Sequence, residues 1–346
     1  MTWRTGAWLL AAAMMTVSGP ALAGKIVVSN WDGYMPKDIA AQFKAASGHD
    51  VEVAVHATNE EIMGKVTATN GEGFDVLFVS APFAQVLSKL GIAEKLDHTK
   101  LPNLKNLYAE AAQLKHDPGN MFSVPYAWGT TGLCYRSDLT AEPTSWNDLL
   151  APKDDIKGKI TMLATDRWLL AAGMLAKGYS VNETDTKKLE DVKTILIEAK
   201  KGLLAYDDTT FYSKLVSGEA VMVQAWDGWC NYGITEKPEI KYVVPKEGSD
   251  LWADTMVIVA SSLNKDVAYA FINFILEANN GKWVAENILY KVPNKAAMDA
   301  LDAGLKAKYP NLAMTPADLT KFEQLVDVGD SQKDYARIVS EIQNAK

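Results

Sequence analysis

Apolar runs and amphipathic segments alternate regularly through the first part of the chain. The apolar runs have the length and the Val, Ile and Phe content of buried strands, and each is followed by a helical pattern that starts and stops at capping residues. This order predicts a mainly parallel, doubly wound α/β sheet with right-handed crossovers. The predicted strands are 25–29, 51–56 and 74–79, and the predicted helices are 36–48, 59–70 and 80–91.

A second strand–helix series begins beyond residue 132 and ends before residue 257. Two apolar strands, 130–135 and 256–259, separate the two series, and we interpret them as crossings between two domains. The predicted lobe 1 comprises residues 24–132 and 257–310, lobe 2 comprises residues 133–256, and residues 311–346 form a helical tail that packs mainly on lobe 2.

The first 23 residues have the pattern of a cleavable signal peptide. Arg4 precedes an apolar run of 11 residues, 7–17, which is too short to span a bilayer. Ala21-Leu22-Ala23 then fits the small-residue pattern of a cleavage site. We therefore expect a soluble, exported product that begins at Gly24 and resides in a bacterial periplasm.

Composition narrows the possible partners. The chain carries 35 basic and 43 acidic residues, for a net charge of −8. This balance argues against nucleic acid, which needs a basic surface, and is compatible with a cationic guest. Only Cys134 and Cys230 are present, and an exported protein could join them in a disulfide. Because sequence does not reveal their separation, both states remain open, and we favour two buried thiols.

Four distant segments place aromatic rings and carboxylates at predicted loops or strand ends. They are 30–34, 224–229, 251–255 and 288–294. Ligands of α/β proteins bind beyond the carboxyl ends of strands and in clefts between domains. Ring faces with one or two carboxylates suit an alkylammonium ion, whose charge is held by the acid and whose methylenes pack on the rings. The alternative is that Trp31 and Tyr34 only fill the end of the first strand, and that Ser80 only caps a helix.

Several strings along the chain resemble one protein family. Among them are Asn30-Trp31 with Tyr34, Thr58-Asn59-Glu60, Pro245-Lys246-Glu247-Gly248, Trp252 with Asp254, and Tyr290 with Pro293-Asn294. In this order the chain is similar to the periplasmic polyamine-binding proteins, the putrescine and spermidine receptors of ABC importers. The resemblance implies a type II periplasmic binding protein, with two doubly wound α/β lobes joined by two crossing strands that close over the amine by hinge motion.

The resemblance also implies roles for individual residues. Asp254 matches the carboxylate that holds an inner amine, and Ser80 matches a nearby hydroxyl. The family usually offers a further acid between Thr165 and Trp168, where this chain has Asp166. The putrescine-binding members have an acid at the position that Trp229 occupies in this chain. A second charge must therefore come from Asp32, Asp166 or Asp227, unless the guest has only one cationic end. The extra ring at Trp229 would suit a bulkier or methylated cation. The expected ligand-binding residues are Trp31, Asp32, Tyr34, Ser80, Asp166, Trp226, Asp227, Trp229, Trp252, Asp254 and Tyr290.

Signatures of other functions are missing from the sequence. The Gly-Lys pairs lack the following Ser or Thr of a phosphate loop, and neither metal-ligand spacing nor a nucleophile–base pair is recognisable. We therefore expect no enzyme activity, no cofactor and no metal. The expected protein is a monomer that captures a polyamine or related organic cation and delivers it to an ABC permease in the inner membrane. The alternative is a sensor of the same fold that signals to a membrane receptor.

Overall fold

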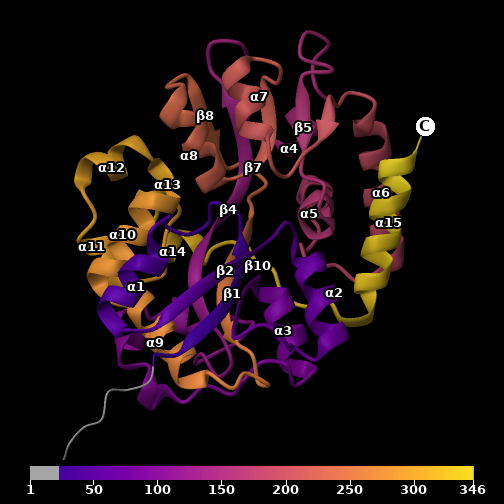
Figure 1. The fold of residues 1–346 in the computed structure, drawn as a ribbon. Helices are drawn as coiled ribbons and strands as arrows, with labels where there is room; N and C mark the ends of the chain where they lie inside the picture. The colour runs from indigo at the N-terminus through magenta and orange to yellow at the C-terminus, as the bar shows by residue number, and fades with distance from the viewer. Residues whose placement is uncertain (1–22, 346) are drawn as a thin grey trace, which may run out of the picture.

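The computed structural model describes residues 23–345, so the predicted signal peptide lies outside the described residues except for Ala23. Ten strands of the described chain form one sheet in the order β2-β1-β3-β9-β4-β7-β5-β6, with β10 beside β9 and β8 beside β4 (Figure 1). The strands are β1 (Lys25–Trp31), β2 (Asp50–His56), β3 (Val76–Ser80), β4 (Val124–Arg136), β5 (Ile160–Met162), β6 (Ala205–Tyr206), β7 (Met222–Trp226), β8 (Ile240–Val243), β9 (Asp250–Ile258) and β10 (Glu323–Gln324).

The sheet is parallel at its two ends and antiparallel in the middle. Strands β2, β1 and β3 pair in parallel at one end, and β7, β5 and β6 do so at the other. Between them, β9 and β4 pair antiparallel with each other and with their outer neighbours. We call the elements around β1–β3 lobe 1 and those around β5–β7 lobe 2. Figure 1 shows β4 running from one lobe into the other, and the predicted boundaries at 132/133 and 256/257 fall inside β4 and β9.

Helices cover both faces of the sheet in lobe 1. Alternate side chains of β3 point to opposite faces, because successive strand residues do so. Val76 and Phe78 pack in one apolar cluster, whereas Leu77 and Val79 pack in another. The helices of the first half are α1 (Ile39–Ser47), α2 (Asn59–Thr69) and α3 (Ala81–Lys89), with short 3₁₀ turns at His98–Lys100, Pro102–Asn106 and Ala111–Gln113.

Lobe 2 carries the next helices, and the final helix packs on it. These are α4 (Trp146–Leu150), α5 (Asp166–Ala176), α6 (Thr186–Lys200), α7 (Phe211–Ser217) and α8 (Asp227–Glu236). The terminal α15 (Gln332–Asn344) lies against α5 and α6. The intervening helices are α9 (Lys265–Ile275), α10 (Ala278–Ile288), α11 (Lys295–Asp299), α12 (Ala303–Lys308), α13 (Pro310–Ala313) and α14 (Pro316–Leu319), followed by a 3₁₀ turn at Gly329–Ser331. Among residues 23–345, no helix has the length and apolar character needed to cross a membrane.

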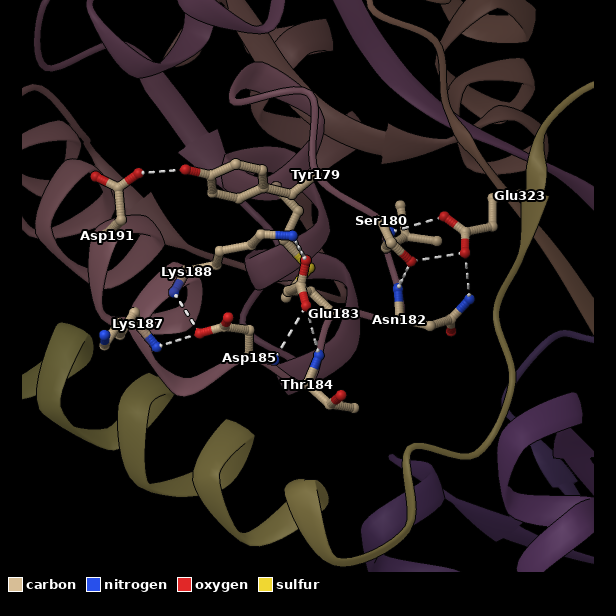
Figure 2. A network of polar contacts seen from close by, with 12 residues as sticks. Tyr179, Ser180, Asn182, Glu183, Thr184, Asp185, Lys187, Lys188, Asp191 and Glu323 are labelled. Carbon is tan, nitrogen blue, oxygen red and sulfur yellow. Dashed lines mark hydrogen bonds and ion pairs between the residues drawn. The ribbon is translucent and has the colours of Figure 1, made fainter.

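The C-terminal segment contacts both the start of β9 and lobe 2 at Glu323. Strand β10 pairs in parallel with β9, with Glu323 opposite Asp250. Figure 2 shows the Glu323 carboxylate facing the loop between α5 and α6. It accepts hydrogen bonds from Ser180 Oγ at 2.7 Å, Val181 N at 3.0 Å and Asn182 Nδ2 at 3.1 Å. The segment before α15 therefore forms a further contact between the crossing strands and lobe 2.

The crossing strands are longer than the apolar pattern predicts. Strand β4 begins at Val124 rather than 130, and β9 begins at Asp250 rather than 256. As a result, Trp252 and Asp254 lie within a strand, and Trp31 and Trp226 are the last residues of β1 and β7. The prediction that the rings stand at loops or strand ends holds for Trp31 and Trp226, whereas it was wrong for Trp252, which lies within β9. Backbone hydrogen bonds to strands on both sides hold β4 and β9 extended through polar residues. A search for apolar runs cannot detect such an extension.

The two cysteines form a disulfide, so the favoured prediction of two buried thiols was wrong. The Sγ atoms of Cys134 and Cys230 are 2.01 Å apart, and the Cα atoms are 5.8 Å apart. Cys134 lies on β4 and Cys230 on α8, two elements that pack together although 96 residues separate the cysteines. The bridge joins the crossing strand to the helix that follows Trp226.

Removing this bridge should weaken the protein. We expect a Cys134→Ala/Cys230→Ala variant to lose about 2–4 kcal/mol of unfolding free energy, because the unfolded chain regains the freedom of a long closed loop. Urea unfolding followed by circular dichroism would measure the change, with the reduced wild-type protein as a second comparison. Equal urea midpoints for the oxidised wild type and the variant would contradict this expectation.

Candidate functional site

The carboxylate of Asp254 lies in lobe 1 and accepts two hydroxyl hydrogen bonds. The β3–β9 ladder places Ser80 directly opposite Asp254. Ser80 Oγ donates to Oδ1 at 2.6 Å, and Tyr34 Oη donates to Oδ2 at 2.9 Å. Ser80 is the N-cap residue of α3, but its side chain makes no capping hydrogen bond to the helix, because its hydroxyl donates to Asp254 instead. Both hydroxyls are oriented by the acid, which leaves its remaining lone pairs for a donor.

Neighbouring groups hold these hydroxyls in place. Asn59 Nδ2 donates to Ser80 Oγ at 3.1 Å, and the Tyr126 hydroxyl donates to the Tyr34 carbonyl oxygen at 2.8 Å. Burial raises the pKa of Asp254 to about 6, an effect opposed by the Ser80 and Tyr34 hydroxyls. Burial also raises the pKa of Tyr34 well above its ordinary value, so its hydroxyl stays a donor. The buried Asp254 carboxylate has hydroxyl donors but no cationic partner among these contacts, so a bound cation would stabilise its ionised form.

Aromatic rings from distant segments meet beside this acid. Trp31 and Tyr34 lie edge to face with centroids 5.6 Å apart, and Tyr34 and Tyr290 do so at 5.1 Å. Tyr290 continues the cluster to Trp252 at 5.6 Å. Tyr34, Trp252 and Tyr290 are buried, and Trp31 is half-buried. Three of the four predicted segments therefore converge around Asp254.

The fourth segment approaches from lobe 2. Tyr232 on α8 links Trp229, at 5.5 Å, to Tyr290, at 6.5 Å. Trp226 packs edge to face on Trp168 at 5.4 Å. The ring of Tyr290 also lies on the backbone of Gly228, where an added Cβ would come within 2.3 Å of the ring. The two lobes are therefore in direct contact through aromatic side chains.

Asp227 lies behind the rings, against the crossing strand. It is 1% exposed, and its Oδ2 accepts a hydrogen bond from Thr130 N at 3.0 Å. A Cβ on Gly129 would come within 2.5 Å of both this oxygen and Trp252 Cζ2. Burial raises the pKa of Asp227 to about 7, opposed by the Thr130 N–H. The structure thus places Asp227 next to Trp252 but bonds it to β4.

The other two candidate acids lie farther out. Asp166 begins α5, is half-buried, and accepts a hydrogen bond from Gln332 Nε2 at 3.4 Å. Burial raises its pKa to about 6, and the negative charge of Glu60 from lobe 1 adds to the effect. A further acid of lobe 2, Asp208, also has its pKa raised to about 6, mainly by burial. Asp32 is exposed to solvent. Of the four expected acids, Asp254 is the one hydrogen-bonded to other expected site residues.

Sequence reasoning did not assign several residues that the structure brings to this region. Asn59 and Tyr126 fix the donors to Asp254, and Trp168 adds a ring next to Trp226. Asp250 lies on the same face of β9 as Asp254, because side chains alternate along a strand. The alternation of Asp250, Trp252 and Asp254 is visible in the sequence, but it gains meaning once these residues are known to share one strand.

Binding of a cation to Asp254 should depend on pH. Because the pKa of the free acid is raised to about 6, the acid is ionised at pH 8 and largely protonated at pH 5. A cation binds the ionised form, so affinity should fall about tenfold per pH unit below pH 6. In the protein without ligand, burial makes the protonated form of Asp254 the more stable one. The contribution of Asp254 to the free energy of unfolding is therefore present at low pH and is lost as pH rises through about 6.

Calorimetry in buffers of different ionisation enthalpy would measure this linkage. We expect net proton release on binding near pH 5.5, because Asp227, Asp250 and Asp254 all have raised pKa values and a bound cation lowers them. Release should vanish near pH 9. Proton uptake at pH 5.5, or constant affinity between pH 5 and 8, would contradict the role given to Asp254.

Two lobes joined by crossing strands, with rings and a carboxylate enclosed between them, define the class of two-lobed solute-binding proteins of type II fold. Residues 38–314 match the family described as bacterial extracellular solute-binding protein, and the chain belongs to this family. That family comprises solute-binding proteins of transporters and is not an enzyme family.

Relatives with assigned names cover nearly the whole chain. The spermidine/putrescine-binding periplasmic protein of Salmonella typhimurium is 31% identical over 311 residues, which cover 88% of each chain. The putrescine-binding periplasmic protein PotF of Escherichia coli is 29% identical over 360 residues, covering 97% of this chain and 95% of the relative. A solved structure, a putative spermidine/putrescine ABC transporter from Listeria monocytogenes, has a TM-score of 0.87 and 26% identity, covering 93% of this chain and 99% of its own.

Proposed function

We propose that this protein captures a polyamine of the putrescine/spermidine class between its lobes and delivers it to an ABC permease. The observation that carries the proposal is the Asp254 carboxylate, held by Ser80 and Tyr34 among rings from both lobes. The relatives are named for binding spermidine and putrescine. Their names and the site chemistry agree on an amine.

The site suits such a guest for three physical reasons. An ammonium group can donate to Asp254 in a charge-assisted hydrogen bond, which is about twice as strong as a neutral one. Ring faces of Trp31, Trp252 and Tyr290 attract the cation and cover the methylene chain. Contact of Tyr290 with Gly228 across the lobes excludes water, which strengthens both terms.

Closure links capture to delivery. A guest that contacts both lobes stabilises the closed form, because it shifts the hinge equilibrium toward the state that it binds better. The closed form then presents one fixed outer surface to a permease in the inner membrane. We propose the periplasm as its location, a monomer as its working state, and no catalytic step. The sensor alternative would use the same site, but the named relatives favour transport.

Calorimetry against putrescine, cadaverine, spermidine, agmatine and choline would test the function. We expect saturable binding of one amine per protein for at least one di- or triamine. A membrane preparation containing the ABC permease that this protein serves should then take up that amine faster when the protein is added. If none of the five cations binds, the proposed function is wrong.

A further inference from the structure

Trp168 is a buried aromatic residue at the lobe 2 end of the ring cluster. It is the third residue of α5 and is 4% exposed. Its ring packs at 88° on Trp226, with the centroids 5.4 Å apart. Gln224 on β7 donates to its carbonyl oxygen at 2.7 Å, which fixes the backbone. Its indole Nε1 is buried and has no hydrogen-bond partner among the described residues.

Asp250 supplies an acceptor in the same place. It is the first residue of β9 and is 0% exposed. Within the part of the chain that the structure describes, neither of its carboxylate oxygens has a hydrogen-bond partner. An unpaired buried carboxylate costs several kcal/mol, so a donor is expected nearby.

Strand register identifies the neighbours of Asp250. Thr130 pairs with Leu251, so Thr131 follows on β4 beside Asp250. Thr131 also pairs with Trp226 on its other side, and Trp226 carries the ring of Trp168. The pKa of Asp250, raised to about 6 by burial, is lowered in part by the Thr131 hydroxyl and the Trp168 indole. Strand register and ring packing therefore bring the acceptor and the donor into one neighbourhood, around Thr131 and Trp226.

Arg167, the charged neighbour of Asp250, is engaged elsewhere. Its Nη1 donates to the Val326 carbonyl at 2.7 Å, and its Nη2 donates to Asn182 Oδ1 at 2.7 Å. Its buried Nε has no hydrogen-bond partner in the described chain, and Arg167 acts on Asp250 through charge alone, without a hydrogen bond. The positive charge of Arg167 thus lowers the pKa of Asp250 without a direct bond. The neutral donors near Asp250 are the Trp168 indole and the Thr131 hydroxyl.

We propose that Asp250 is a positioning residue that accepts the indole N–H of Trp168 and thereby fixes this ring as the end wall of the guest site. The inference rests on the proposed function. Asp250 and Asp254 share one face of β9 and are about 13 Å apart along the strand. One end of the guest binds the Asp254 carboxylate, and the other meets the rings of Trp168 and Trp226.

This arrangement defines how the far end of the guest is recognised. A ring face attracts a cation without needing an N–H donor, so it accepts a methylated nitrogen as well as a primary amine. A carboxylate at the same place would favour the primary amine, which donates hydrogen bonds. The site should therefore bind putrescine and its derivative trimethylated on one nitrogen with affinities within about threefold of each other.

Binding measurements on Trp168→Leu test the wall. Loss of the ring should weaken both ligands about tenfold, the size expected for a desolvated cation–π contact. 1-Aminobutane, which has no far cation, should lose less than about threefold. Exclusion of the trimethylated ligand by wild-type protein, or equal losses for all three ligands, would overturn the proposal.

A double-mutant cycle tests the positioning by Asp250. Asp250→Asn keeps an acceptor for the indole and should bind putrescine within about threefold of wild type, whereas Asp250→Leu should bind about tenfold more weakly. In a Trp168→Phe background, which lacks the N–H, Asp250→Leu should cause no further loss. Additive losses, or equal damage by Asn and Leu, would overturn the positioning role.

The same cycle measured by urea unfolding does not depend on a ligand. Coupling between Asp250 and Trp168 should appear as a non-additive shift of the unfolding midpoint. Additive midpoint shifts would overturn the contact. If wild-type protein bound no amine, the proposed function and the guest wall would both fail, whereas the unfolding cycle would still report whether Asp250 holds Trp168.

Discussion

Replacing Asp254 by alanine is expected to reduce affinity for the bound amine at least 100-fold. The variant removes the acid that two hydroxyls orient at 2.6 and 2.9 Å, and leaves the ammonium without its partner in an enclosed site. Breaking a buried pair on one side costs about 3–5 kcal/mol, which corresponds to a loss of about two to four orders of magnitude. Calorimetry with the best-binding amine would measure the loss.

The fold should survive this change. Asp254 is a carboxylate whose pKa burial already raises to about 6, so its removal relieves a desolvation cost in the empty protein. The matched control is Asp38→Ala, which removes an exposed acid of the same lobe outside the expected site and should bind within about threefold of wild type. If Asp254→Ala bound like wild type, the anchoring carboxylate would be assigned to the wrong residue.

Replacing Gly228 by alanine should reduce binding nearly as much by a different route. An added Cβ would lie 2.3 Å from Tyr290 Cγ and Cδ1 and 2.4 Å from Cδ2, so the ring and the helix cannot keep their present contact. Tyr290 belongs to lobe 1 and Gly228 to α8 of lobe 2, so relief requires the lobes to separate or Tyr290 to leave the cluster. Overpacking of about 1–3 kcal/mol corresponds to a loss of about 5- to 150-fold in affinity.

Stability and binding should change in opposite senses in this variant. Alanine is favoured over glycine by up to about 1 kcal/mol in a helix, and Gly228 is the second residue of α8, so the open protein should unfold at an equal or slightly higher urea concentration. Gly64→Ala is the matched control, because Gly64 lies within α2 and a Cβ there would meet nothing within 4 Å. It should leave binding unchanged. Full affinity in Gly228→Ala would show that this contact is not needed for the bound state.

The two variants separate two requirements of the site. In the proposed function Asp254 supplies the charge that binds a cation, so its loss should act on the ligand contact itself. Gly228 supplies space for a ring of the opposite lobe, and its loss should act on closure. A small-angle scattering profile with saturating amine would distinguish them: Gly228→Ala should stay more extended than the wild-type complex.

Local pattern was sufficient for the short elements of the first hundred residues. The predicted strands and helices of the first hundred residues lie close to β1–β3 and α1–α3, because periodicity and capping residues mark them directly. The same local pattern predicted only the second half of β4 and of β9. Strand β4 is buried at all 13 positions, so it shows no alternation, and polar residues such as Thr130 and Thr131 lie inside it.

Pairing of the cysteines and choice among the acids needed the tertiary structure. The bonds from Ser80 and Tyr34 to Asp254 join residues 174 and 220 positions apart, and no local pattern reports such distances. The same holds for the disulfide across 96 positions. The resemblance matches Asp254 to the anchoring carboxylate and leaves Asp32, Asp166 and Asp227 open as the source of a second charge. The structure shows Asp227 bonded to Thr130 on the crossing strand.

The sequence by itself determined the α/β character, the acidic balance and the supply of rings and carboxylates at four places along the chain. These follow from composition and short-range periodicity, which act over one or two turns or a few strand residues. Only the tertiary structure decided that the hydroxyls of Ser80 and Tyr34 hold Asp254 among the rings and that Tyr290 meets Gly228. The reason is physical: strand register and lobe contact set these distances, and both depend on the whole chain folding together.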